Sequence, residues 1–171
     1  MMKRTSICLA MAAYAAMNTT AFAAPGVNGF AEWRVGPRLR DDAARSGDAT
    51  LDEARLQLES AAAVKNAQFR VKADLVYDGV AEEGNIEARE INASFSPVRS
   101  VDLKIGRQTL TWGAGDYLFI NDLFPKDWES FLLGRDDEYL KAPSDAIKAG
   151  FFSDVGNLDV VFTPRFNSDR Y

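Results

Sequence analysis

Apolar and polar residues alternate strictly along much of this chain, and this period of two is the feature that most constrains its fold. Between positions 69 and 77, apolar residues occupy the odd positions, whereas Arg70, Lys72 and Asp74 occupy even ones. Successive side chains of a β-strand point to opposite faces, so the pattern predicts strands with one apolar and one polar face. The pattern recurs at 54–59, 90–95, 101–105, 147–151 and 158–162, with a less regular strand expected at 30–35. The chain is therefore predicted to be all-β.

Connections of two lengths separate the predicted strands. Tight polar turns are expected at 96–100 and 153–157, longer acidic connections at 40–50 and 78–85, and one very long loop at 110–143. Short turns at one end and long loops at the other indicate an antiparallel up-and-down meander. The stretch 51–64 contains many helix-favouring residues, but its alternation favours a strand. Strands of roughly ten residues exceed the usual length in soluble sheets and match a tilted bilayer crossing.

The first 23 residues resemble an export signal. Lys3 and Arg4 precede an uncharged apolar run at 7–17, which is too short for a membrane-spanning helix, although a short anchor is the alternative. Small residues at 21 and 23 predict cleavage between Ala23 and Ala24. The predicted domain, 24–171, then has no cysteine, because the only one is Cys8.

Composition excludes several classes of function. The chain has no histidine, which removes imidazole acid–base chemistry and the common catalytic triads. Its net charge of −5 and lack of a basic run argue against nucleic acid as a partner. An acidic surface turn explains Asp136-Asp137-Glu138 better than a calcium site does, because the spacing differs from that of a calcium-binding loop. We expect no enzymatic activity, no cofactor and no metal.

Export, long alternating strands and the missing cysteines are together typical of an outer-membrane β-barrel. Lipid cannot satisfy an open sheet edge, so such strands must close into a ring. The predicted fold is an antiparallel up-and-down transmembrane β-barrel of about six to eight strands with one long loop. The alternative is a soluble periplasmic β-sheet protein that binds a ligand or partner, with its apolar face turned inward. Alternation alone does not separate the two.

A motif at the end of one predicted strand resembles the porins of Gram-negative outer membranes, particularly the alginate-export type. The matching residues are Gly106, Arg107, Gln108, Leu110, Gly113 and Gly115, followed after the loop by Asp145-Ala146. The resemblance covers roughly positions 101–152 and implies a passive channel in the outer membrane. Because barrels of that family are longer, it also implies that this chain is the amino-terminal portion of a longer barrel. A complete eight-stranded barrel is the alternative.

On this interpretation the polar face lines a water-filled lumen. The candidate solute-facing residues are Arg55, Arg70, Lys72, Asp74, Lys104, Arg107 and Arg135. Three basic residues on adjacent strands, at positions 55, 70 and 72, are the best candidates for attracting an anionic or polyhydroxylated solute.

The long loop has two alternative placements. It could fold into the lumen as a constriction, with Arg107 and Arg135 facing Asp122 and Asp127, or pack as an external cap through its aromatic residues. The expected partners are outer-membrane lipid and small solutes, and a homo-oligomer is also compatible with the sequence.

Overall fold

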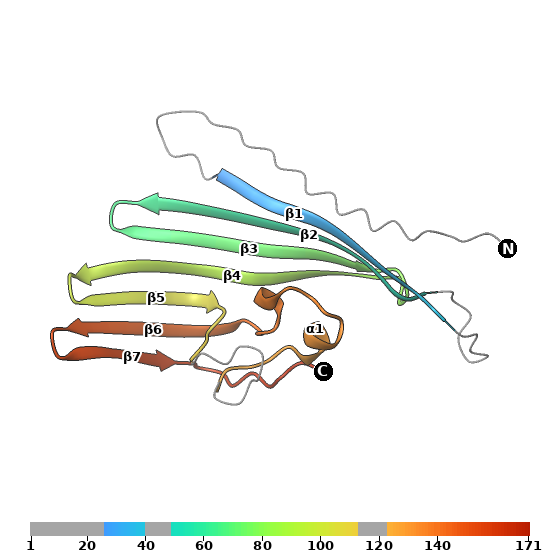
Figure 1. Cartoon of the computed structure of the whole chain (residues 1–171). Coiled ribbons are helices and arrows are strands. Elements are labelled where there is room, and N and C mark those ends of the chain that lie inside the picture. The colour runs from blue at the N-terminus through green and yellow to red at the C-terminus, as the bar shows by residue number, and fades with distance from the viewer. Residues whose placement is uncertain (1–25, 40–48, 113–122) are drawn as a thin grey trace.

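The computed structural model describes residues 26–39, 49–112 and 123–171, which form one antiparallel sheet of seven strands (Figure 1). The strands are β1 (Gly26–Pro37), β2 (Ala49–Val64), β3 (Ala67–Asp78), β4 (Glu83–Val98), β5 (Val101–Gln108), β6 (Ser144–Ser153) and β7 (Gly156–Phe162). Each strand pairs with the next along the chain, which confirms the predicted all-β, up-and-down topology. Within the described residues β1 and β7 do not pair with each other, so the sheet is open.

The connections follow the predicted two-ended arrangement, with some changes in length. Two-residue turns join β2 to β3, β4 to β5 and β6 to β7 at one end of the sheet (Figure 1). At the other end, the connection between β3 and β4 covers only 79–82, because both strands extend further than the alternation indicated. The stretch 51–64 lies within β2, as its alternation predicted.

In the sequence, apolar residues occupy odd positions up to 105 but even positions at 110 and 112, which predicts a bulge or a strand end in between. β5 pairs with β6 from Val101 to Gln108 without a register shift, so a strand end rather than a bulge accounts for the change. Gly106 has a φ of +121°, and a Cβ there would lie 2.3 Å from the Ile91 carbonyl oxygen. Only glycine fits such a close approach of two strands.

One face of the sheet, the apolar face, carries large apolar side chains that are exposed. In register, Leu56 pairs with Leu75, and Leu75 with Ile86, so these side chains form rows across neighbouring strands. Many large apolar side chains of this face are between 40% and 73% exposed, among them Trp33, Leu56, Leu58, Phe69, Val71, Leu75, Tyr77, Ile86, Ile91, Ile105, Ile147, Phe151, Leu158, Val160 and Phe162. A conventional soluble core is thus missing on this side of the described sheet.

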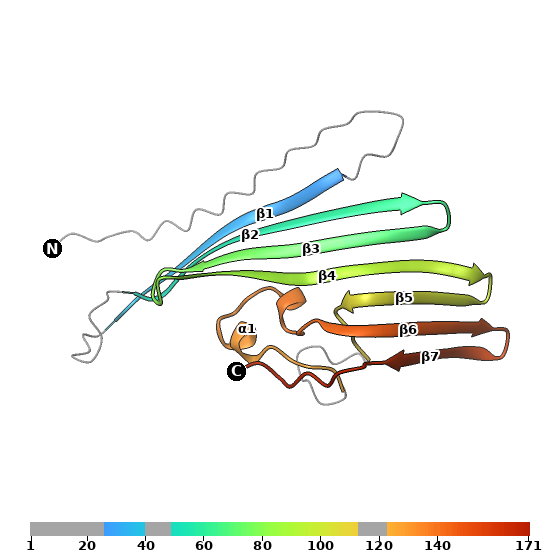
Figure 2. The same cartoon turned by 180° about the vertical axis from the view of Figure 1, so that it is seen from behind.

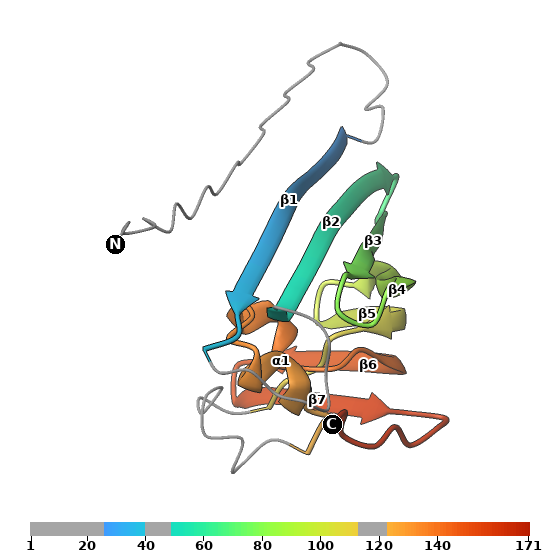
Figure 3. The same ribbon diagram turned by 90° about the vertical axis from the view of Figure 1, so that its right-hand side faces the viewer.

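The opposite face, the polar face, is the concave one, and chain following β5 covers part of it (Figures 2 and 3). The covering chain, 123–143, is called here the docked segment. It contains α1 (Trp128–Leu132) and the 3-10 turn η1 (Asp137–Tyr139). The side chain of Asp127 caps α1 by accepting a hydrogen bond from the Ser130 amide at 2.8 Å.

Buried apolar residues gather around the docked segment rather than within the sheet. They are Leu110, Phe124, Tyr139, Leu140, Ala142 and Ala146, and only the last belongs to a strand. The predicted signal segment 1–23, its cleavage site at Ala23 and Ala24, and Gly113, Gly115 and Asp122 lie outside the described residues.

Candidate functional site

Charged side chains on the polar face of β2 to β4 are buried beneath the docked segment. Glu53, Arg55, Asp74 and Arg89 are each at most 6% exposed. A buried ionised group costs free energy unless it is paired and hydrogen-bonded. The partners of these four residues therefore determine what the arrangement does.

Arg55 lies between two carboxylates. Its Nη1 donates to Asp74 Oδ2 at 2.8 Å, and its Nη2 donates to Glu53 Oε1 at 3.0 Å. Glu53 lies two residues away on the same face of β2, and Asp74 lies on β3, where it pairs with Gln57. The alternation predicted that Arg55 and Asp74 share the polar face, and the strand register brings them together.

The docked segment inserts Tyr139 into this cluster. The ring centroid lies 4.3 Å from Arg55 Cζ and 4.7 Å from Arg89 Cζ, so two guanidinium groups contact one aromatic ring. The phenol oxygen accepts a hydrogen bond from Gln57 Nε2 at 2.6 Å. Burial raises the pKa of Tyr139, and the negative charge of Asp74 raises it further. The phenol therefore stays protonated, and its ring supplies cation–π stabilisation without adding charge.

Glu138 anchors the docked segment to β2 and β3. Its carboxylate accepts hydrogen bonds from Lys72 Nζ at 2.9 Å and from Gln57 Nε2 at 2.8 Å. Burial acts to raise the pKa of Glu138, but the hydrogen bonds from these two residues and the charges of Lys72 and Arg89 outweigh it, and the pKa is lowered. The carboxylate is therefore ionised in the docked state at neutral pH.

Arg89 was missed as a candidate from sequence because it lies at a β-bulge. Lys72 pairs with Glu90 and Ala73 with Ala88, so Arg89 is the extra residue of β4. It reaches the docked segment, donating to the carbonyl oxygens of Glu138 at 2.6 Å and Lys141 at 3.3 Å. The signal available in the sequence was the spacing of apolar residues, which changes from two to three between position 88 and Ile91.

Arg135 was predicted to face Asp127 but binds other carboxylates. It forms ion pairs with Glu53 and, at 3.1 Å, with Glu129, and it donates to Ser130 Oγ at 2.9 Å. Asp127 instead caps α1 and lies 3.6 Å from Arg170 Nη1. The predicted partner of Arg135 was wrong, because the Asp127 side chain caps α1 and accepts a hydrogen bond from the backbone of that helix.

The chain after β7 also holds the docked segment. Arg170 and Lys126 pair through the hydrogen bond from the Arg170 amide to the Lys126 carbonyl oxygen, and the Trp128 amide donates to Arg170. The carboxylate of Asp169 accepts from the Trp128 indole at 3.1 Å. Arg170 also forms an ion pair with Glu87 of β4. Segments far apart in sequence are thus joined on the polar face.

The remaining predicted lumen residues are spread over the sheet. Arg70 is half exposed and lies 3.5 Å from Glu59, and Lys104 lies 3.7 Å from Glu90, both on the polar face. Arg107 differs from the prediction: its register partners are Ile91 and Asp145, so it lies at a position of the apolar face. The strand alternation continues through 107, and this places Arg107 at the loop end of that face, 3.9 Å from Asp145.

The basic residues that were expected to attract anions are already paired. Arg55 contacts two carboxylates, while Lys72 and Arg70 both lie within 4 Å of Glu59. Ion pairing reduces the field that a passing solute feels.

Only part of the long loop, including residues 123–143, belongs to the described chain, and its position can be compared with the two predicted placements. Residues 123–143 lie on the polar face, and aromatic packing occurs there as well. Phe124 contacts Trp112 at a ring-centroid distance of 5.3 Å, and Trp128 contacts Phe131 at 6.0 Å. The aromatic residues of the described part of the loop therefore pack within a segment that lies against the polar face of the sheet.

Within the described residues, no three His, Cys, Asp or Glu side chains are grouped so as to hold a metal ion. No helix in the same part of the chain is both long and apolar enough to span a membrane. Comparisons with models of known families, with curated proteins and with solved structures found no match.

Proposed function

We propose that this protein is a porin-like channel of the outer membrane, in which the apolar face contacts lipid and the docked segment narrows a water-filled lumen. Small solutes would pass by diffusion, without a catalytic residue or cofactor. The observation that carries this proposal is the orientation of the sheet: its uncharged apolar side chains are exposed, while most of its charged side chains lie on the concave face, some of them beneath folded chain (Figure 3).

The height of the apolar face supports a membrane location. Outward positions of β2 from Ala54 to Val64 carry no charge, and the same holds for β3 from Ala67 to Tyr77. Ten residues at ~3.3 Å each span ~33 Å along the strand. At the usual barrel tilt of ~40°, this is a height of ~25 Å, which matches the apolar band of outer-membrane barrels.

Aromatic residues lie at the loop end of this band. Trp33 pairs with Ala54, and Ala54 with Tyr77, so both aromatic side chains occupy one row across three strands. Both face outward, at 70% and 51% exposure. Aromatic side chains at that level are typical of the boundary between hydrocarbon and water.

The alternative, a soluble periplasmic β-sheet protein, requires the apolar face to be covered. The described chain covers the polar face instead, and a water-exposed apolar surface of this extent is unfavourable in a soluble monomer. The charges outside the docked segment also suit a lumen, since the partly exposed pairs Arg70–Glu59 and Lys104–Glu90 remain in contact with water on the concave face.

A charge placed on the apolar face tests the proposal. Val71 lies midway along the band and is 49% exposed, so Val71→Arg would alter stability by roughly 0.5 kcal/mol or less if this face were in contact with water. At the middle of a bilayer the same change costs ~2–4 kcal/mol. The matched control is Val155→Arg in the β6–β7 turn, which is 99% exposed and lies beyond the band.

We expect Val71→Arg to reduce the amount of folded protein in outer-membrane fractions, with Val155→Arg unchanged. The unmodified protein should require detergent for extraction and should conduct ions in planar bilayers. Extraction of the unmodified protein by buffer alone would refute the membrane location and favour the soluble alternative. Membrane insertion without conductance would leave a closed structural barrel and refute the channel.

A further inference from the structure

A cavity of about 510 Å³ lies on the polar face at the short-turn end of the sheet, away from the docked segment. Its volume falls within the range of ~300–1,000 Å³ that is common for small-molecule sites. Gln68, Ser94, Lys104 and Lys148 form one row across β3 to β6, because each is the register partner of the next. The cavity is therefore part of the proposed lumen surface.

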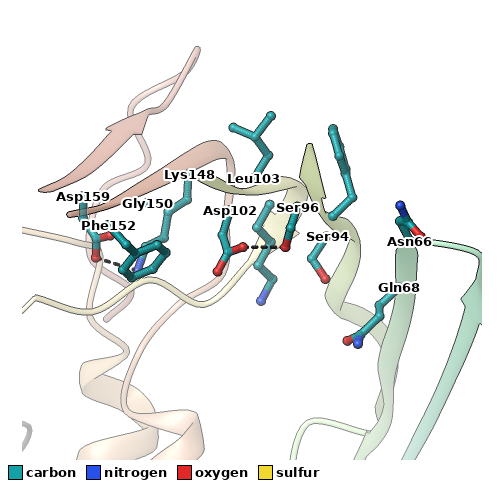
Figure 4. A pocket seen from close by; sticks show the side chains of 12 residues that line it. Asn66, Gln68, Ser94, Ser96, Asp102, Leu103, Lys148, Gly150, Phe152 and Asp159 are labelled. Carbon is teal, nitrogen blue, oxygen red and sulfur yellow. Dashed lines mark hydrogen bonds and ion pairs between the residues drawn. The ribbon is translucent and has the colours of Figure 1, made fainter. Parts of the chain in front are cut away.

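Hydrogen-bonding groups of several kinds line the cavity. Figure 4 shows Asn66 and Gln68 on one side, with Ser94, Ser96 and Asp102 between them and the opposite wall. The side chains of Asn66, Gln68 and Ser94 form no hydrogen bond with another part of the described chain. Amides and hydroxyls both donate and accept, which is what a ligand rich in hydroxyl groups requires.

Phe152 forms the opposite wall and differs from its surroundings. It is 44% exposed, although it lies on the polar face. Gly150 makes room for its ring, since a Cβ at that glycine would lie 3.3 Å from Phe152 Cζ and 3.1 Å from Asp159 Oδ1. The ring packs against the strand on one side and is accessible on the other. An exposed aromatic ring with a carboxylate beside it and amides across the cavity suits the apolar C–H face of a sugar ring.

The charges of the cavity compensate one another. Two lysines and two aspartates line it, and Lys148 Nζ lies 3.0 Å from Asp159 Oδ2. Lys104 is paired with Glu90, and Asp102 accepts a hydrogen bond from Ser96 Oγ at 2.5 Å. Since each lysine already has an acidic partner, an anionic ligand gains little attraction here.

We propose that this cavity is a binding site for a neutral carbohydrate, with the sugar ring stacked on Phe152 and its hydroxyl groups bound by Asn66, Gln68 and Ser94. The inference rests on the proposed channel and narrows its solute to uncharged sugars. Binding at such a site must be weak, in the millimolar range (roughly 4 kcal/mol), because a solute in a channel has to leave again.

Ligand-observed NMR titrations of the purified protein with glucose and with glucuronate test this assignment, because the two ligands differ only in the carboxylate at C6. We expect glucose to bind at least about fivefold more tightly than glucuronate, and Phe152→Ala to weaken glucose binding about five- to tenfold. Phe152→Tyr should retain the affinity because it keeps the ring. Phe151→Ala is the matched control. Phe151 is the neighbour of Phe152 and is similarly exposed, at 42%, but it lies on the apolar face.

Gln68→Ala is a second variant, which tests the site even if Phe152→Ala fails to fold. Its side chain is exposed, and its removal should weaken glucose binding at least about threefold. No glucose binding by the unmodified protein, equal or tighter binding of glucuronate, or an unchanged affinity in both variants would overturn the site. Ion conductance of the same preparations separates the two proposals. Conductance without sugar binding refutes only the site, and sugar binding without conductance refutes only the channel.

Discussion

Tyr139 shows how one aromatic residue makes a charged surface able to accept the docked segment. Its ring contacts two guanidinium groups, and its hydroxyl accepts a hydrogen bond from Gln57. Both arginines are almost fully buried, so the aromatic ring takes the place of water against the planar faces of their guanidinium groups. Neither contact could be inferred from the alternation, because Tyr139 lies in a loop whose path over the sheet has no local sequence signal.

Two substitutions separate the ring of Tyr139 from its hydroxyl. Tyr139→Phe removes one hydrogen bond and should lower the local stability of the docked segment by about 0.5–1.5 kcal/mol. Tyr139→Leu also removes both cation–π contacts, and we expect it to cost about 1–2 kcal/mol more. Hydrogen-exchange protection of the Asp127 and Ala142 amides, which bond to Leu140 and Pro125, measures both effects. Equal protection in the two variants would show that the two cation–π contacts do not stabilise the docked segment.

Glu138 makes docking dependent on pH. Its pKa in the folded protein is lowered from the ordinary value of 4.5, so its contribution to stability is fully present above that value. The contribution is lost as the pH falls through the lowered folded pKa, because protonation removes the charge that binds Lys72. We expect exchange protection of the docked segment, corrected for intrinsic rates, to fall as the pH drops below about 4.5. Glu138→Gln is the control and should be less protected at neutral pH, with a weaker dependence on pH.

At the scale of elements, alternation predicted which face most residues of β2 to β7 occupy. Phe69, Val71 and Leu75 share the exposed apolar face with the register the pattern implied. The prediction failed at two positions, one where a bulge interrupts the strand and one where the regular strand continues beyond the alternating residues. The bulge in β4 turns Arg89 towards the polar face, and the unbroken register of β5 leaves Arg107 on the other one. The ion-pair cluster beneath the docked segment could be predicted only in part, because its partners come from distant stretches of chain.

Single-residue deletions test the β4 bulge. Deleting Arg89 would leave a regular strand with Ala88 still outward and Glu90 still inward, so the sheet should assemble while the docked segment loosens. Deleting Ala88 would instead put Arg89 in the outward position, midway along the apolar face. If the apolar face contacts lipid as proposed, an arginine there costs ~2–4 kcal/mol, and we expect folded protein in the membrane to fall sharply. Protease resistance of membrane fractions compares the two, and similar amounts of both would contradict the assigned bulge.

At the scale of the whole molecule, the docked segment determines how much of the concave side remains open. The backbones of Lys126 and Lys141 lie next to each other in an antiparallel bridge, so the chain between them can be removed without stretching the sheet. Replacing 127–140 with two glycines should expose the polar face to water. In the proposed channel, single-channel conductance should rise at least about twofold.

An unchanged conductance in that variant would mean that solutes do not pass beside the docked segment. The variant also exposes Arg55 and Asp74, but water can hydrate both, and the sheet itself should persist. The amount of folded protein recovered from membranes should be the same for the variant and the unmodified protein. Equal amounts show that a difference in conductance arises from the pore and not from assembly.

The open edges of the sheet have a consequence for how the molecule is made. Within the described residues, β1 pairs only with β2 and β7 only with β6. A folded sheet with unpaired edge strands and an exposed apolar face would aggregate with other copies as soon as it formed in water. For the membrane protein proposed above, strand pairing and entry into lipid are therefore expected to occur together. Before insertion, such a chain would have to remain unfolded and bound to a chaperone until both edge strands form their final pairs.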